Sequence, residues 1–172
     1  MTGPTRHEKK MNHHLKLLVV LGDGGHTAEI VRLIELLGSD YDYAYLITTQ
    51  DRISESKITI PGSIHYIVRP RAKEERMGRV AWNLVYSFGQ AAWLLYRIRP
   101  HAVLGSGPAV MVPVALLGRL ARAKIIYIEN ACRVTELSLT GKIMLRVADL
   151  FFVQWEQLQR IYPHTIFAGR LL

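Results

Sequence analysis

The residues best suited to chemistry lie in a glycine-rich run at positions 22–27, Gly-Asp-Gly-Gly-His-Thr. Glycines let a backbone turn sharply and approach a ligand closely. A helix that starts after such a run directs free N–H groups and a partial positive charge at an anion such as phosphate. We therefore take Gly22, Gly24, Gly25 and Thr27 as candidate phosphate-binding residues, with the Thr27 hydroxyl as a donor or helix cap.

His26, within the same run, is the first candidate catalytic residue. A helix N-terminus favours the neutral imidazole, which suits either a general base or a hydrogen-bond donor to phosphate. A tight turn without a ligand, with His26 in a structural role, is the alternative interpretation. Three glycines followed by a histidine are more than such a turn needs.

The run differs from a dinucleotide-binding fingerprint, G-x-G-x-x-G, because Thr27 stands at its last position. Asp51 does lie near the end of the second predicted strand, where a ribose-binding acid would sit. A dinucleotide-dependent enzyme therefore stays open as a further alternative. A Walker A loop is absent, since residues 140–142 lack the required strand and glycine spacing.

Polar residues also follow the other predicted strands. Ligands of doubly wound sheets bind at the carboxyl ends of the strands, so these residues should converge on one edge. Glu129 ends a buried strand and is the second catalytic candidate, either orienting a hydroxyl or acting as a base. Arg71 and Lys73 are cations suited to binding a diphosphate. The full set of remaining candidates for binding an acceptor or its phosphates is Arg71, Lys73, Ser106, Gly107, Asn130 and Arg133.

Short apolar runs alternate with helical patterns along the whole chain. This alternation predicts βαβ units, and so an α/β fold with a Rossmann-like, doubly wound parallel sheet. We expect a flexible basic tail over residues 1–14 and a single domain over residues 15–172. The predicted strands are 15–21, 43–49, 63–68, 102–105, 124–128 and 150–153, and the predicted helices are 26–37, 80–96, 109–121, 138–147 and 154–161.

Composition limits the classes of function. The 172 residues are 49% hydrophobic and 21% charged, which is typical of one folded domain. A net charge of +8 favours an anionic partner: nucleic acid, an acidic membrane or a phosphate-bearing ligand. The basic residues are dispersed and match no nucleic-acid motif, so we predict no nucleic-acid partner. The single cysteine, Cys132, excludes an internal disulfide and gives no zinc-binding spacing, so we expect no metal.

Residues 80–96 form a predicted helix without a charged side chain, flanked by Arg79 and Arg97. At ~1.5 Å per residue the helix would be about 26 Å long, short of a ~30 Å hydrocarbon core, and it contains polar residues. Trp82 and Trp93 with the two arginines are typical of a helix lying on anionic lipid. A crossover helix packed on the sheet is the alternative, and one helix can do both.

The order of motifs resembles the acceptor-binding subunit of the two-part UDP-N-acetylglucosamine transferase of the dolichol pathway, and its bacterial exopolysaccharide transferase relatives. The runs 137–142, Leu-Ser-Leu-Thr-Gly-Lys, and 153–155, Val-Gln-Trp, are the distinctive matches. Residues 75–78, Glu-Arg-Met-Gly, depart from the family's Val-Gly-Gln-Ser, and residues 1–14 lack the membrane anchor of eukaryotic members. The other matching segments are 22–27, 70–74, 99–100, 107–108, 112–113, 127–129, 133–134, 148–150 and 169–171.

The resemblance implies the N-terminal half of a GT-B glycosyltransferase and an inverting, metal-independent transfer of a sugar, N-acetylglucosamine foremost, from a UDP-sugar, with no cofactor. The chain would bind a lipid-diphosphate-linked sugar acceptor and recruit a separate donor-binding chain, without which it would be inactive. It would sit peripherally on the cytoplasmic face of a membrane, the plasma membrane in a prokaryote or the endoplasmic reticulum in a eukaryote. A non-catalytic membrane scaffold for a glycosyltransferase is the alternative.

Overall fold

The computed structural model describes residues 14–22, 25–51, 53–68 and 77–171, with the backbone alone for residue 25 and residues 77–84. Its strands form one parallel sheet in the order β3-β2-β1-β4-β5-β6-β7. The predicted α/β class with a doubly wound parallel sheet is therefore confirmed. The strands are β1 Lys16–Val20, β2 Asp42–Thr48, β3 Ser63–Ile67, β4 Ala102–Ser106, β5 Lys124–Ile128, β6 Leu150–Val153 and β7 Ile166–Phe167.

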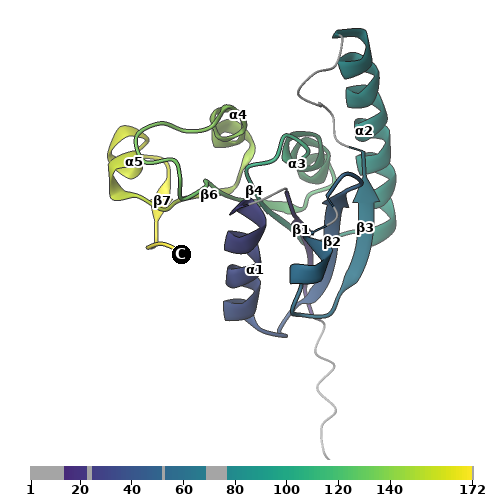
Figure 1. Cartoon of the computed structure of the whole chain (residues 1–172), viewed down its shortest axis with the longest axis horizontal. Helices are drawn as coiled ribbons and strands as arrows, with labels where there is room; N and C mark the ends of the chain where they lie inside the picture. Colours follow the sequence, from purple (N-terminus) through teal and green to yellow (C-terminus); the bar gives the residue numbers. More distant parts are fainter. Residues whose placement is uncertain (1–13, 23–24, 52, 69–76, 172) are drawn as a thin grey trace, which may run out of the picture.

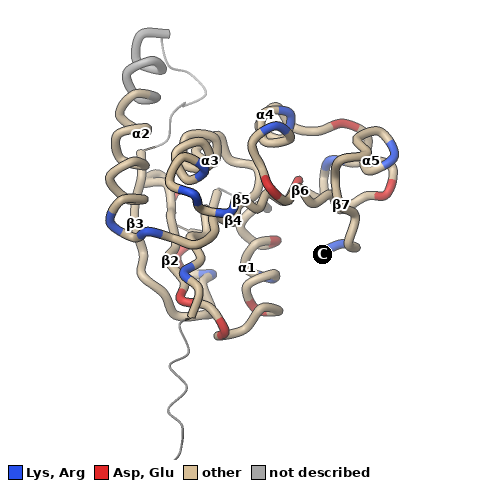
Figure 2. The backbone as a smooth tube through the Cα atoms, turned by 180° about the vertical axis from the view of Figure 1, so that it is seen from behind, with Lys and Arg blue, Asp and Glu red and all other residues tan. Residues whose placement is uncertain are grey.

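Helices cover the two faces of the sheet unequally (Figure 1). Helix α1 packs on one face, while α2, α3 and α4 follow one another across the other face. Lys and Arg are spread over several elements of the described chain instead of forming one patch (Figure 2). The helices are α1 Gly25–Leu37, α2 Met77–Ile98, α3 Met111–Leu120, α4 Leu139–Val147 and α5 Glu156–Ile161, with a short 3-10 helix, η1, at Glu55–Lys57.

Strand β1 shows why its apolar run is continuous. Leu18 and Val20 belong to the core beneath α2 and α3, whereas Leu17 and Val19 belong to the core beneath α1. All four side chains are buried, because a central parallel strand has helices or loops on both faces. Each contributes about 1.5–3 kcal/mol relative to an exposed side chain.

Helix α2 is longer than the predicted 80–96 and divides its two faces between packing and exposure. Ala91, Leu94 and Leu95 are buried against the sheet and α3. Trp93 and Tyr96 lie on the other side and are 58% and 73% exposed. Across the described parts of the chain, no helix is both long enough and apolar enough to cross a membrane. The helix is thus a packed crossover helix with an exposed aromatic face.

Sequence patterns missed two short elements and extended three helices, predicted at 109–121, 138–147 and 154–161, past their observed bounds. Helix η1 and strand β7 have three and two residues, too few for a periodic signal. The last helix starts at Glu156, not at 154, because Trp155 is its N-cap residue and has an extended backbone. Of the predicted tail over 1–14, only His14 falls within the described residues, and its ring Nδ1 lies 2.9 Å from the Asp40 carbonyl oxygen.

Candidate functional site

The sheet order reverses direction between β1 and β4, and the chain leaves these neighbouring strands toward opposite faces. In open α/β sheets ligands bind at such a switch point, and the region between the loops after β1 and β4 is here called the crevice. Here the two loops approach each other closely: a Cβ on Gly22 would lie 2.7 Å from the Pro108 ring. A Cβ on Gly107, whose φ is +70°, would lie 2.2 Å from the His26 ring. Both glycines are therefore required by packing at the crevice, whatever ligand it takes.

Thr27 is completely buried and its hydroxyl is used inside the protein. It donates to the Gly22 carbonyl and lies 2.7 Å from the Ser54 hydroxyl. These contacts fasten the start of α1 to the end of β1. They give no support to the predicted phosphate contact of Thr27, which stays a prediction.

Asp51 serves the turn before η1. Its Oδ1 accepts hydrogen bonds from the backbone N–H groups of Ile53, at 3.1 Å, and Ser54, at 3.0 Å. A ribose-binding acid would instead direct its oxygens at the ligand. The turn uses Oδ1 alone, and the buried Oδ2 has no hydrogen-bond partner among the described residues, so the dinucleotide alternative stays untested by this contact.

His26 and Asn130 meet across the crevice, with His26 Nδ1 2.9 Å from Asn130 Nδ2. Burial of the ring, and then the positive charge of Arg133, lower the pKa of His26 below its ordinary value. The imidazole is therefore neutral near pH 7. Arg133 itself is exposed, so its effect on His26 acts through its charge.

The lowered pKa of His26 predicts a pH-dependent contribution to stability. The contribution is fully present above the ordinary pKa of 6.5 and is lost as the pH falls below 6.5 toward the lowered folded value. Chemical denaturation at about pH 7.5 and about pH 5.5 should therefore show a larger loss of stability for the wild type than for His26→Gln. Equal losses would show that His26 titrates alike in both states.

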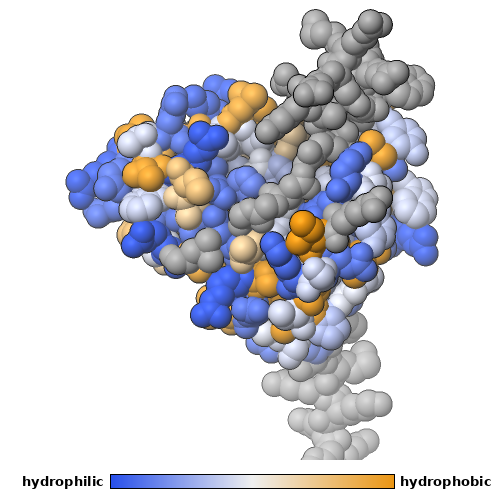
Figure 3. Space-filling view, viewed as in Figure 1, coloured by the Kyte–Doolittle hydropathy of each residue, from blue (hydrophilic) through white to orange (hydrophobic). Residues whose placement is uncertain are grey.

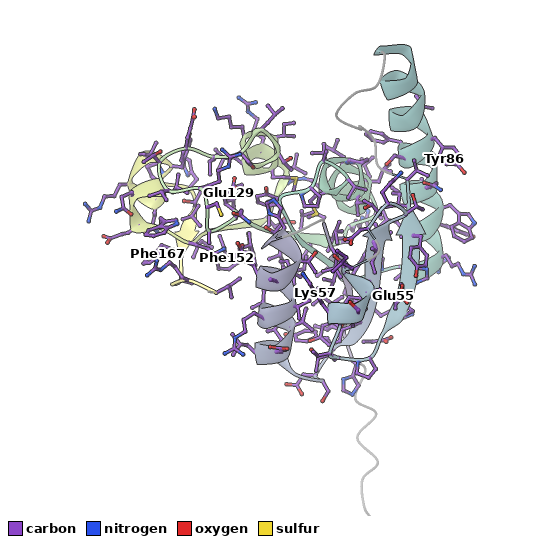
Figure 4. The ribbon with its side chains drawn as sticks, viewed as in Figure 1. Glu55, Lys57, Tyr86, Glu129, Phe152 and Phe167 are labelled. Carbon is purple, nitrogen blue, oxygen red and sulfur yellow. The ribbon has the colours of Figure 1, made fainter. Side chains whose placement is uncertain are left out.

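Glu129 directly follows β5 in the interior, near α4 (Figure 4), and is 0% exposed. Its Oε1 accepts from the Asn130 backbone N–H at 3.1 Å, and its Oε2 accepts from both the N–H and the hydroxyl of Ser138 at 3.0 Å. Ser138 in turn caps α4 by accepting from the Gly141 N–H at 2.9 Å. Burial raises the pKa of Glu129, while these hydrogen bonds oppose the rise.

These contacts describe a carboxylate that positions the loop from 129 to 138. A catalytic base needs a free lone pair directed at the substrate. Glu129 is 0% exposed, and its oxygens already accept three hydrogen bonds within the chain, so the carboxylate is enclosed by its neighbours. Its role as a base stays a prediction, and the geometry favours a positioning role.

The sequence interpretation missed Glu29 on α1. The side chain is 1% exposed; its Oε1 accepts from the Ala131 N–H at 3.1 Å and its Oε2 from Gln154 Nε2 at 2.7 Å. The same Gln154 nitrogen donates to the Glu129 carbonyl at 3.1 Å, and Gln154 Oε1 accepts from the Leu171 N–H at 2.9 Å. Burial raises the pKa of Glu29. The available signal was its position four residues before Leu33, on the apolar face of the helix.

An apolar pocket of about 210 Å³ adjoins this network between α1, β5, β6 and the C-terminal segment. Ile128, Phe152 and Leu171 are among its lining residues. Figure 3 shows small groups of hydrophobic residues among hydrophilic ones on this side of the molecule. Most of the pocket's lining residues are apolar, whereas polar side chains border the crevice beside it.

The remaining predicted residues fall into two groups. Ser106 is completely buried at the end of β4, and its hydroxyl has no hydrogen-bond partner within the described chain. The Gly107 N–H donates to the Tyr127 hydroxyl at 3.2 Å. Gly25 begins α1. Outside the described residues or side chains lie Gly24, Arg71, Lys73, Arg79 and Trp82.

The strand order defines a Rossmann-type α/β protein, a class in which ligands bind at the switch point of the sheet, here between β1 and β4. A family model described as "Oligosaccharide biosynthesis protein Alg14 like" matches residues 17–171. The chain belongs to this family, as its motifs predicted.

Relatives and solved structures agree with this assignment. The rat protein named "UDP-N-acetylglucosamine transferase subunit ALG14" is 38% identical over 92% of this chain and 83% of its own length. The human protein of the same name is 35% identical over the same shares. A UDP-N-acetylglucosamine 2-epimerase superposes with a TM-score of 0.66 at 16% identity, and MurG of Acinetobacter baumannii with 0.64 at 17%.

These two superpositions show the fold alone. They cover 86% and 81% of this chain, but only 44% and 41% of the epimerase and MurG chains. The chain thus corresponds to less than half of each solved structure. This is the relation that the predicted half of a GT-B fold requires.

Proposed function

We propose that this chain is the acceptor-binding subunit of an inverting glycosyltransferase that uses UDP-N-acetylglucosamine as a substrate. It holds a lipid-diphosphate-linked sugar, and a separate chain binds the donor. The observation that carries the proposal is the 38% identity to a relative named a transferase subunit, over 92% of this chain and 83% of that relative. No metal or cofactor takes part, and the UDP group is bound by the partner.

The β1/β4 crevice is the site we assign to the acceptor diphosphate. Gly107 and Pro108 lead from the carboxyl end of β4 toward α3, at the edge of the sheet where ligands of such folds bind. The unpaired Ser106 hydroxyl lies at the start of the same loop, and His26 borders it through its contact with Gly107. Arg133 adds positive charge near His26. These groups are chemically suited to a diphosphate and its first sugar.

A transfer assay tests the proposal. The chain is purified alone and in complex with a donor-binding chain, and the transfer of N-acetylglucosamine to a short-chain lipid-diphosphate acceptor is measured. We expect turnover with the complex and none with either chain alone. Turnover by the isolated chain would contradict the proposal.

A non-catalytic scaffold is a second candidate, and one observation favours it. Glu129 and His26, the two predicted catalytic side chains, are both held by contacts within the chain. In this case the partner and the acceptor would supply all groups that react. His26→Ala with unchanged kcat in the complex would support the scaffold.

The exposed face of α2 is the surface we assign to the membrane. Val85, Tyr86 and Trp93 line a shallow apolar depression, and Tyr86 points away from the sheet in Figure 4. The Arg97 and Arg99 guanidinium carbons lie 5.3 Å and 5.4 Å from the ring centres of Trp93 and Tyr96. Aromatic rings with cations beside them suit the interface of an anionic bilayer, here its cytoplasmic face. Contact is peripheral.

Replacing Trp93 and Arg97 together by Ala and Glu should weaken binding to anionic vesicles about tenfold. The change removes an interfacial aromatic ring and reverses a charge that is worth about 1 kcal/mol near an acidic surface. Sedimentation with phosphatidylserine-containing vesicles measures the effect. Arg146→Glu, an exposed charge reversal on α4, is the control and should change binding less. Equal effects of both changes would contradict the assignment of α2.

A further inference from the structure

The orientation of the Asn130 side chain is fixed by the turn that follows β5. Its Oδ1 accepts from the Cys132 N–H at 2.8 Å, while its backbone carbonyl accepts from the Arg133 N–H at 2.9 Å. An asparagine that bonds the backbone two residues ahead forms an Asx turn. Because only the amide oxygen can accept from an N–H group, this contact determines which end of the amide is which.

The amide nitrogen of Asn130 is therefore the group that faces His26. Nδ2 lies 2.9 Å from His26 Nδ1, and it can only donate. Nδ1 must then accept and carry no proton. A neutral imidazole has one N–H, so its proton resides on Nε2.

The groups around the pair allow little reorientation. The backbone of Ala131 is held on both sides, since its N–H donates to Glu29 at 3.1 Å and its carbonyl accepts from Trp155 Nε1 at 2.6 Å. The His26 ring lies against Gly107, at a point where even one added carbon would overlap it. Asn130 is 7% exposed, so water has little access to replace its contacts.

We propose that Asn130 is a positioning residue that holds His26 as the Nε2–H tautomer, so that His26 meets a ligand in the crevice as a hydrogen-bond donor. The Nδ1 lone pair is already occupied by Asn130, and Nε2 carries the proton. Neutral His26 therefore has no lone pair to offer as a general base. That the ligand is an acceptor diphosphate rests on the proposed function.

Nitrogen NMR of the full chain, labelled at its histidines, tests the tautomer directly. The His26 signals are identified by their loss in His26→Gln among the seven histidines of the chain. Near neutral pH we expect an unprotonated Nδ1 and a protonated Nε2. A protonated Nδ1, or an even mixture of tautomers, in the wild type would overturn the proposal even if no Asn130 variant folds.

Asn130→Asp should reverse the tautomer. One carboxylate oxygen can still accept from the Cys132 N–H, while the other now faces Nδ1 and favours a proton there. Gln157→Glu, an exposed change of amide to acid on α5, is the matched control and should leave the His26 signals in place. An unchanged tautomer in a folded Asn130→Asp variant would also overturn the proposal.

Asn130→Asp should also change the acceptor KM, which is measured independently of the NMR signals. In the complex with a donor chain, Asn130→Asp should raise the acceptor KM about tenfold or more, because a charge-assisted hydrogen bond is lost and a negative charge is added. Gln157→Glu should leave KM within about twofold. If Asn130→Asp reverses the tautomer but leaves KM unchanged, the positioning of His26 by Asn130 stands. The proposal that His26 binds the acceptor is then contradicted.

Discussion

Gly141→Ala should lower the free energy of unfolding by about 2–3 kcal/mol, although alanine is the better helix former. Gly141 lies in the first turn of α4, directly over the buried carboxylate of Glu129. An added Cβ would lie 1.9 Å from Glu129 Oε2 and 3.1 Å from the Ser138 hydroxyl. The carboxylate would have to leave Ser138, and a buried charge would lose two of its donors. Chemical denaturation monitored by circular dichroism measures the change.

Gly89→Ala is the matched control for this prediction. Gly89 also lies within a helix, α2, but nothing lies within 4 Å of the position of an added Cβ. Helix propensity then acts alone, and the variant should be about 0.5–1 kcal/mol more stable than the wild type. If Gly141→Ala gave the same gain as Gly89→Ala, the packing described around Glu129 would be wrong.

Glu129→Ala should destabilise the protein by about 3 kcal/mol. The substitution leaves the N–H of Asn130 and both donors of Ser138 without their acceptor in a buried position. Glu129→Gln should recover part of this loss, because its amide oxygen can still accept from one side. Glu136→Ala is the control: its exposed carboxylate pairs with Lys142, at 2.8 Å, and the substitution should cost far less than Glu129→Ala.

The same variants separate positioning from catalysis at Glu129. If it positions the loop, the stability and the turnover of the complex fall together, and Glu129→Gln recovers part of both. A fully stable Glu129→Ala protein with abolished turnover would instead establish a catalytic base.

The effects of Gly141→Ala and Glu129→Ala on stability should also be coupled, since Glu129→Ala removes the carboxylate with which the Gly141→Ala methyl collides. The double variant should therefore be less destabilised than the sum of the single variants.

Sequence patterns located the central strands well because those strands are buried on both faces. Strands β5 and β6 have the predicted bounds, since each is a short apolar run enclosed by polar residues. The exact pairing order could not follow from patterns, because it depends on which helices pack on which face. Two-residue β7 carries no periodicity and is defined by its pairing with β6.

The candidate site was predicted in part. Glycine and polar residues at strand ends predicted a convergence on one edge of the sheet, and His26, Gly107 and Asn130 do meet there. Residue type could not show which polar side chains are free to bind a ligand. Thr27 and Glu129 are candidates in the sequence, but in the fold both form hydrogen bonds with neighbouring residues. Glu29 was missed because a glutamate in an amphipathic helix is usually solvated, whereas here it holds Ala131 and Gln154.

The central claim is that this chain binds the acceptor and not the nucleotide-sugar. Titration of the isolated, nitrogen-labelled chain with a short-chain lipid diphosphate bearing N-acetylglucosamine, and separately with UDP-N-acetylglucosamine, compares the two directly. We expect saturable shifts of the His26, Gly107 and Asn130 signals with the lipid diphosphate and none with the nucleotide-sugar. Saturable binding of the nucleotide-sugar at this crevice, with no response to the lipid diphosphate, would contradict the account.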